Sequence, residues 1–186
     1  IRADKITSSL ARAGHHTVIV SRNRTGLPVR EKLEENLFVQ RLPSFPLAMV
    51  RNLINFPAFF SPFWLLTIAY SILMARANLI IVRDLPMAPA AWFVGKLMRI
   101  PVVIDMAEDY PAMIQDTWDH RGPARFDILL RNPKLLRRLE SWLLPKMDGV
   151  VVVSPASGKR VETIVKSLPV GIHVAQNTPR LSSAVE

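Results

Sequence analysis

Residues 79–110 read LIIVRDLPMAPAAWFVGKLMRIPVVIDMAEDY, and this stretch decides the expected fold. Two short runs of aliphatic, largely β-branched residues, 79–82 and 101–105, enclose a segment that starts like a helix, with Asp84 as its cap and Pro86 in its first turn. Each run is apolar at consecutive positions, so we expect both faces of each strand to be covered. The order strand, helix, strand predicts two parallel strands joined by a crossover helix.

The same alternation continues on both sides of this stretch. The chain opens in a helical pattern that stops at Gly14, and further apolar runs predict strands over 17–21, 37–41, 149–153 and 171–176. Together these features predict an α/β fold, an open parallel sheet with helices on both faces.

Two more helix starts are expected where a capping residue precedes a proline. Asn132 stands before Pro133, and Ser154 stands before Pro155. The helix that follows Asn132 is expected to bury one stripe of apolar side chains: Leu135, Leu136, Leu139, Trp142 and Leu143.

The composition limits the class of protein. With 186 residues, of which 49% are hydrophobic, the chain can form a folded domain, and a disordered tail is excluded. It has no cysteine, which excludes disulfides and zinc–thiolate sites. Lys and Arg number 24 against 15 Asp and Glu, and the net charge of +9 favours a partner that is anionic, such as a phosphorylated substrate or a phospholipid surface. Nucleic acid is disfavoured, because the aromatic residues lie in apolar runs rather than among the basic ones.

One stretch, 52–75, contains no charged residue and has the length of a membrane span. Pro57 and Pro62 interrupt it, and the helix expected from Pro62 to Ala77 has about 16 residues, or about 24 Å, which is shorter than the roughly 30 Å hydrocarbon core. We therefore expect a buried crossover helix, preceded by an apolar hook over 53–63 that rests on a membrane surface. The charged opening residues predict no signal peptide.

Ligands of an open α/β sheet bind outside the carboxyl ends of its strands, so the residues that follow each predicted strand are the candidate site. They come from distant parts of the chain and are expected to meet at one rim: Arg83, Asp84, Asp105, Glu108, Tyr110, Ser154 and Asn177.

The densest group holds three carboxylates, Asp105, Glu108 and Asp109, within five positions. Such a group can accept hydrogen bonds from sugar hydroxyls, supply a base, or bind a divalent cation through oxygen. The structural alternative is that Asp105 ends a strand and the other two stabilise a helix N-terminus. Arg83 can meet a phosphate or carboxylate, whereas capping is the favoured role for Asp84 and Ser154.

Several kinds of site are excluded by missing motifs. The four histidines form no metal-binding spacing, and the sequence has no G-x-G-x-x-G, no G-x-x-x-x-G-K-[ST] and no G-x-S-x-G. We therefore expect neither a standard dinucleotide fingerprint, nor a P-loop, nor a serine-hydrolase elbow, and no metal site.

Five segments occur in a familiar order: LARAGHHTVIVSR at 10–22, LFVQRLP at 37–43, ANLIIVRDLPMAPAAWFVGKLMRIPVVIDMAEDYP at 77–111, LESWLLPKMDGVVVVSPASGKRV at 139–161 and VAQNTP at 174–179. The series resembles the first lobe of family-4 glycosyltransferases from about Ile6 to Pro179. The resemblance implies a Rossmann-like, acceptor-side lobe of a GT-B fold over residues 1–186, with 52–76 as hook and crossover helix. It also implies that the family's first strand and its C-terminal, donor-binding lobe are absent.

By this resemblance the whole enzyme would be a hexosyltransferase that uses a nucleotide-sugar as co-substrate, retains configuration and needs no metal or other cofactor. Glu108 and Asp105 match by position as catalytic candidates, and the others as substrate-binding residues: Arg83, Asp84, Tyr110, Ser154 and Asn177. Where the family pattern often has His, this chain has Ala107. Since donor binding belongs to the second lobe, we expect this chain alone to be inactive.

The acceptors frequent in the family, polysaccharides and lipid-linked sugars, imply a cytoplasmic bacterial enzyme at the inner face of the plasma membrane. Two alternatives stay open. One is a sugar-nucleotide epimerase lobe, which would bind nucleotide within this chain. The other is a non-catalytic docking module that binds membranes through Phe59, Phe60, Phe63 and Trp64.

Overall fold

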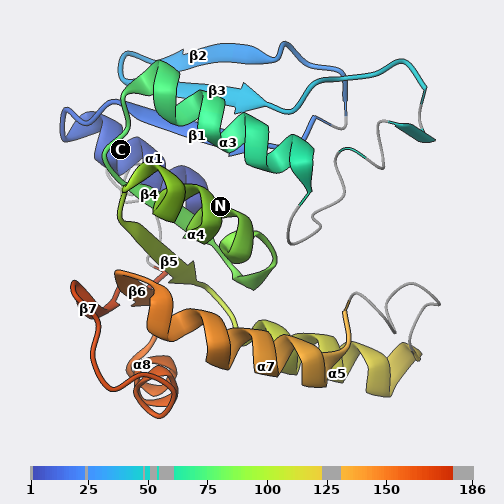
Figure 1. The fold of residues 1–186 in the computed structure, drawn as a ribbon, viewed down its shortest axis with the longest axis vertical. Helices are drawn as coiled ribbons and strands as arrows, with labels where there is room; N and C mark the ends of the chain where they lie inside the picture. The colour runs from blue at the N-terminus through green and yellow to red at the C-terminus, as the bar shows by residue number, and fades with distance from the viewer. Residues whose placement is uncertain are drawn as a thin grey trace, which may run out of the picture. The chain divides into compact units, whose positions relative to one another are not determined.

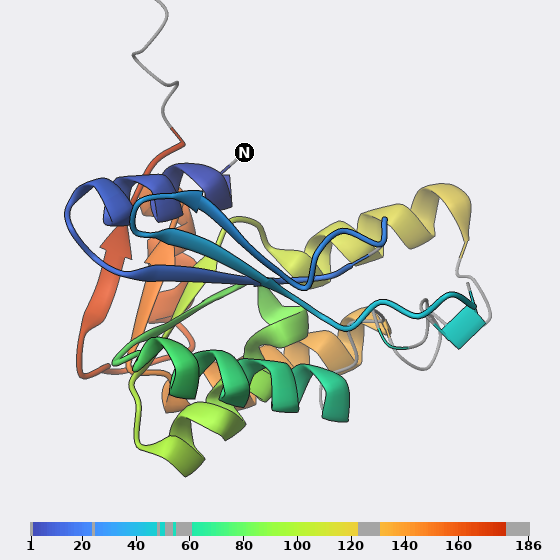
Figure 2. The same cartoon turned by 90° about the horizontal axis from the view of Figure 1, so that it is seen from above.

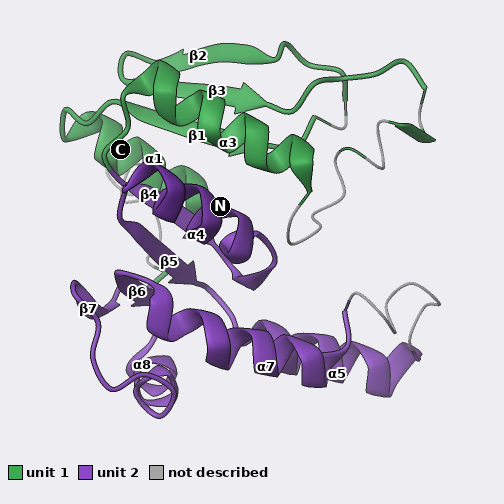
Figure 3. Cartoon of the chain, viewed as in Figure 1, with its two compact units in different colours: residues 1–78, 177–186 green, residues 79–176 purple. Residues whose placement is uncertain are grey.

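A computed structural model describes residues 2–23, 25–47, 49–50, 54, 61–122 and 131–177. The chain divides into two compact units, each with its own sheet: unit 1 comprises residues 1–78 and 177–186, and unit 2 comprises residues 79–176 (Figure 3). We describe each unit by itself. Most of the apolar hook predicted over 53–63, namely residues 53 and 55–60, lies outside the described residues.

In its described residues, unit 1 contains a three-stranded sheet between helices α1 and α3. Its elements are α1 (Arg2–Arg12), β1 (Thr17–Ser21), β2 (Arg30–Glu34), β3 (Leu37–Arg41) and α3 (Pro62–Ala75). The strand order is β1-β3-β2, with β1 parallel and β2 antiparallel to β3. Both helices contact β1 and β3, and Figure 2 shows them on opposite faces of the sheet. The predicted strands β1 and β3 are confirmed, whereas the charged strand β2 was not predicted.

Helix α3 is the expected crossover helix. It starts at Pro62 and ends two residues before the predicted Ala77. One side packs inward through Trp64, Ile68 and Ile72, which are all buried, so Trp64 is not available for the membrane contact expected of it. Of the helices in the described ranges, none is both long and apolar enough to cross a bilayer.

Unit 2 is built on four parallel strands in the order β4-β5-β6-β7 (Figure 1). The α/β class and the parallel sheet flanked by helices are thereby confirmed. Strand β5 lies inside the sheet and is buried at all five positions, as its apolar sequence predicts. The strands are β4 (Ile80–Arg83), β5 (Val102–Met106), β6 (Gly149–Val152) and β7 (Gly171–Val174).

Helices connect these strands. In the described residues, a 3₁₀ turn and an α-helix follow β4, two α-helices that contact each other and a second 3₁₀ turn follow β5, and one α-helix follows β6. In chain order they are η1 (Leu85–Met87), α4 (Ala88–Met98), α5 (Tyr110–Arg121), α7 (Pro133–Leu143), η2 (Leu144–Lys146) and α8 (Pro155–Glu162).

Two of the three predicted helix caps are confirmed. The Asn132 side chain accepts from the Lys134 and Leu135 N–H groups, and Ser154 accepts from the Ser157 N–H. The capping role predicted for Asp84 is wrong. Asp84 precedes the 3₁₀ turn η1 without a side-chain cap bond, and α4 itself begins four residues later at Ala88.

The buried stripe predicted for α7 is only partly correct. Leu136 and Leu143 are buried, but Leu135 and Trp142 are 49% and 46% exposed. The inward position between Leu136 and Leu143 belongs to Glu140, which is fully buried. The helix is therefore rotated so that a carboxylate, rather than Trp142, faces the interior.

Each sheet has an apolar parallel strand, β1 or β4, at one of its edges. Among the described residues, β1 pairs only with β3, and β4 pairs only with β5. The outer edge strand of unit 1, β2, differs in carrying Arg30, Glu31, Lys32 and Glu34.

Candidate functional site

The carboxyl ends of β4 and β5 form the centre of the candidate site in unit 2. Arg83 is paired with Asp105 in the parallel ladder, and the Asp84 N–H donates to the Asp105 carbonyl at 3.0 Å. The turn after β4 is thus fixed against the end of β5. Arg83, Asp84 and Asp105, which lie up to 22 positions apart in sequence, meet at one rim as predicted.

Asp84 has an unusual backbone conformation, with φ of 58° and ψ of 166°. This region is essentially restricted to glycine, and another residue there costs about 1–3 kcal/mol. The conformation directs the carboxylate across the rim, where Oδ1 accepts from the Ala107 N–H at 3.2 Å and Oδ2 from Arg83 Nε at 3.3 Å. Backbone strain of this kind is common at functional sites. It persists only where the surrounding structure imposes it.

The Asp84 carboxyl also has a perturbed pKa. Burial raises the pKa, the Arg83 guanidinium and the Ala107 N–H lower it, the Asp105 carboxylate raises it, and the net shift is upward. Asp105 itself is 2% exposed. The Asp105 carboxylate therefore lies close enough to the Asp84 carboxyl to affect the pKa of Asp84.

The segment after β5 supplies a second, exposed carboxylate. Glu108 is exposed at the start of the turn, whereas Asp109 caps α5 by accepting from the Ala112 N–H at 3.1 Å. Tyr110 begins α5, and its hydroxyl accepts from Arg131 Nη2 at 3.3 Å. The three carboxylates that the sequence grouped together thus divide: Asp105 is buried, Glu108 faces solvent and Asp109 stabilises a helix.

An ionic network that the sequence analysis missed supports this rim. Arg160 donates to both Glu140 oxygens at 2.9 and 3.0 Å, and Arg137 donates to Glu140 at 3.0 Å. Both guanidinium groups also pair with Asp109, at 2.9 Å from Arg137 and 3.4 Å from Arg160. Burial alone lowers the pKa of Arg137, but the hydrogen bonds to Asp109 and Glu140 outweigh it and raise that pKa. The signal in the sequence was Glu140, a charged residue four after Leu136 and three before Leu143.

Ser154 lies on the same edge of the sheet, because β6 is paired with β5 and Met106 faces Val152 in that ladder. Its hydroxyl is engaged with Ser157, through the N–H at 3.1 Å and through the side-chain oxygen at 2.9 Å. Asn177 belongs to unit 1, where its side-chain oxygen accepts from Arg2 Nη1 at 3.2 Å. Six of the seven predicted residues thus lie in unit 2, at or after the carboxyl ends of β4, β5 and β6, whereas Asn177 lies in unit 1. The roles of all seven stay predictions.

The described part of the chain contains no cluster of three or more His, Cys, Asp or Glu residues that could hold a metal ion. The rim offers instead a solvent-facing carboxylate (Glu108), a half-buried guanidinium (Arg83), and the half-buried carboxyl of Asp84 beside the buried carboxyl of Asp105. These groups suit hydrogen bonds to hydroxyls and one contact to an anionic substituent.

Comparison with solved structures shows that this fold is a known one. Two solved structures of sucrose-phosphate synthase from Thermosynechococcus elongatus have a similar fold. One matches with a TM-score of 0.68 and 13% identity over 96% of this chain and 85% of the other. The second matches with a TM-score of 0.67 and 14% identity over 97% of this chain, which spans only 43% of that longer protein. No curated protein matches the sequence.

The family match covers nearly the whole sequence. Residues 1–177 match the family described as "Glycosyl transferase 4-like domain", which includes both units and every candidate site residue. On this match, the chain belongs to the glycosyl transferase 4-like family.

Proposed function

We propose that this chain forms the acceptor side of a retaining glycosyltransferase that takes a hexose from a nucleotide-sugar without a bound metal. The donor would be held mainly by a further part of the whole enzyme, so the 186 residues alone would have little activity. The acceptor would be a sugar of a polysaccharide or of a lipid-linked carrier. We place the reaction at the cytoplasmic face of a bacterial membrane.

The observation that carries this proposal is the strained Asp84 beside the buried Asp105, at the carboxyl ends of β4 and β5. Ligands of parallel α/β sheets bind at this edge, and strain at such an edge supports a binding role. Membership of the glycosyl transferase 4-like family supports a substrate of glycosyl transfer as that ligand.

In the proposed reaction, the acceptor hydroxyl oxygen bonds to the anomeric carbon of the donor sugar while the bond from that carbon to the nucleotide phosphate breaks. The hydroxyl proton leaves to a base. Glu108 is exposed and able to contact the acceptor, whereas Asp105 is 2% exposed and acts by holding the rim and Asp84 in place. Arg83 would contact an anionic group, and Tyr110 and Ser154 would border the acceptor.

Binding to the isotope-labelled chain tests the proposal. Hexoses, hexose phosphates and short oligosaccharides would be titrated while amide NMR signals are recorded, followed by UDP- and GDP-sugars. We expect one acceptor class to shift the signals of residues 83–84 and 105–110, and the nucleotide-sugars to bind weakly. Glu108→Gln should weaken acceptor binding about tenfold, since a hydrogen bond to a charged group contributes about 1.5–3 kcal/mol.

Glu162→Gln is the matched control, because Glu162 is an exposed carboxylate of the same unit at the end of α8. Equal effects of the two substitutions, or no shift at the rim with any acceptor, would contradict the acceptor role. Tight binding of a UDP-sugar by this chain alone would favour the epimerase alternative.

A further inference from the structure

Two tryptophans join α4 to α7 on the outside of unit 2. The rings of Trp92 and Trp142 meet edge to face, with centroids 5.3 Å apart and an interplanar angle of 76°. A lysine ammonium lies over each ring: Lys96 Nζ is 5.4 Å from the Trp92 ring centroid, and Lys146 Nζ is 4.3 Å from the Trp142 ring centroid. We call these four residues the tryptophan–lysine face.

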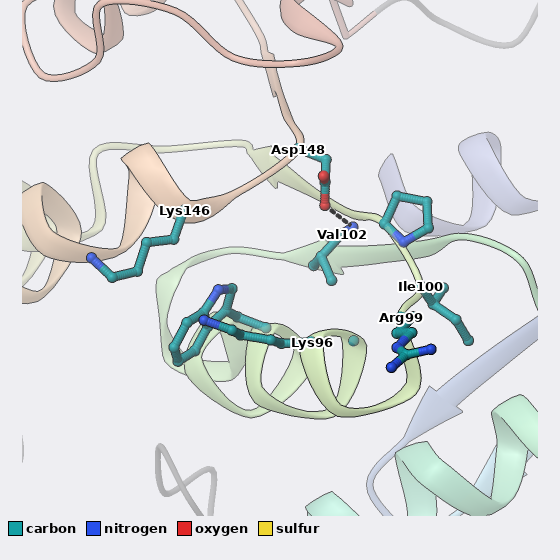
Figure 4. Close-up of a pocket in the computed structure, with 9 residues that line it drawn as sticks. Lys96, Arg99, Ile100, Val102, Lys146 and Asp148 are labelled. Atoms are coloured by element: carbon teal, nitrogen blue, oxygen red, sulfur yellow. Dashed lines mark hydrogen bonds between the residues drawn. The ribbon is translucent and has the colours of Figure 1, made fainter.

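A cavity of about 590 Å³ opens beside this face at the amino ends of β5 and β6. Its lining includes Lys96, Arg99 and Lys146, and one carboxylate, Asp148. Figure 4 shows Lys96 and Lys146 extending to the same side of the cavity, with Arg99 toward its other end. The Asp148 carboxylate is occupied, because it accepts from the Val102 N–H at 2.7 Å. The cavity therefore carries a net positive charge.

Cations without ionic partners stand next to exposed apolar side chains here. Within the described ranges, Lys96, Arg99, Lys146 and Arg138 form no ion pair. Leu97 on α4 is 73% exposed, and Leu135 on α7 is 49% exposed. Leu135, Arg138 and Trp142 follow one another at spacings of three and four, so they share the outward side of α7.

We propose that the tryptophan–lysine face, with Leu97, Leu135, Arg99 and Arg138 at its border, docks on a bilayer that contains anionic phospholipid. The lysines and arginines would contact lipid phosphates, while Trp142 and the two leucines would enter the interfacial region. A bilayer surface offers the phosphate and the apolar layer together, which matches this mixture of side chains. Lys96, Arg99 and Lys146 line the cavity at the amino ends of β5 and β6, so docking through these cations would leave the carboxyl-end rim of unit 2 accessible.

Single-stranded nucleic acid fits this surface less well. Such binding uses open aromatic ring faces on which bases stack. Here one lysine ammonium lies over the Trp92 ring and another over the Trp142 ring, and the two rings also contact each other. The proposal does not depend on the glycosyl-transfer proposal, because it stands on a different surface.

Vesicle sedimentation with the full chain tests the proposal. The vesicles would contain phosphatidylcholine alone or an equimolar mixture with phosphatidylglycerol. We expect binding only to the mixed vesicles, with an affinity that falls as salt is added. The double variant Lys96→Gln/Lys146→Gln should bind about 30-fold more weakly, since each basic residue at an anionic surface contributes roughly fivefold.

Lys159→Gln/Lys166→Gln is the matched control, since both lysines are exposed in unit 2 and the net charge changes equally. Leu97→Ser is a second probe that should weaken binding several-fold without affecting folding, because that side chain is mostly exposed. Equal losses in the two double variants, or no binding to mixed vesicles, would overturn the proposal. Displacement of the chain from vesicles by inorganic phosphate at equal ionic strength would also overturn it, as would binding of an RNA oligonucleotide through these same lysines.

Acceptor binding in solution should not change in any of these variants, which separates this test from the test of the proposed function.

Discussion

The backbone of Asp84 provides the sharpest test of the site. At φ of 58° and ψ of 166°, a residue with a Cβ costs about 1–3 kcal/mol more than glycine. Replacement by Ala and replacement by Gly both remove the hydrogen bonds from Ala107 and Arg83, so comparing the two variants isolates the backbone. Glycine is more flexible in the unfolded chain, and this lowers the free energy of unfolding of the glycine variant by about 0.5–1 kcal/mol. We therefore expect Asp84→Gly to be more stable than Asp84→Ala by about 1–2 kcal/mol.

Urea unfolding followed by tryptophan fluorescence measures this difference, because three of the four tryptophans, Trp92, Trp118 and Trp142, lie in unit 2. Glu108 is the control position, since it is exposed and does not have a positive φ. At position 108, the glycine variant should be less stable than the alanine variant, or the two should be equally stable. Equal stability of Asp84→Gly and Asp84→Ala, within about 0.3 kcal/mol, would refute the assignment of strain to this residue.

The same pair of variants separates stability from binding. Both lack the carboxylate that bonds to Ala107 and lies near Asp105, so both should lose acceptor binding. A glycine variant that is stabilised and yet binds no acceptor would show that the strain is retained for function rather than for folding.

Three further predictions follow from the described contacts. Glu140→Leu should destabilise unit 2 by about 1–3 kcal/mol in urea unfolding, since Arg137 and Arg160 lose their hydrogen bonds to a buried carboxylate and keep only Asp109 as an ionic partner; no loss of stability would contradict this. The raised pKa of Asp84 means that the folded chain binds a proton at this carboxyl more tightly than the unfolded chain does. The contribution of Asp84 to stability is therefore greatest below about pH 4 and declines as the pH rises through the folded pKa. Asp84→Asn should remove that decline from a pH series of unfolding curves, and an unchanged series would refute the prediction. Gly95→Ala should lower the melting temperature although alanine favours helices, because the added Cβ would overlap Val102 Cγ2 and lie 2.9 Å from the Ile100 carbonyl oxygen.

The sequence predicted the elements whose local signals agree with their tertiary surroundings. Strand β5 is recognisable because its apolar run is buried on both faces. The helices after Asn132 and Ser154 are recognisable because a side-chain oxygen and a following proline each favour the same start.

The features that were not predicted correctly depend on contacts with distant residues, which a local sequence pattern does not indicate. Strand β2 has an exposed, charged sequence and forms because β3 offers it an edge. The rotation of α7 depends on Arg160, 20 positions beyond Glu140, which makes a buried carboxylate tolerable. Asp84 has the sequence of a helix cap, but the end of β5 provides the Ala107 N–H as a different donor for its carboxylate.

In the described part of the chain, β1 and β4 each have one side that pairs with no other strand, and this has a practical consequence. Natural sheets commonly protect such borders with charges, as β2 does, but β1 carries none and β4 only Arg83. The amide and carbonyl groups along an unpaired edge of an apolar strand can form hydrogen bonds with a strand of another polypeptide. Preparations of these residues should therefore self-associate as concentration rises, and a short extended peptide that caps either strand should keep them monomeric.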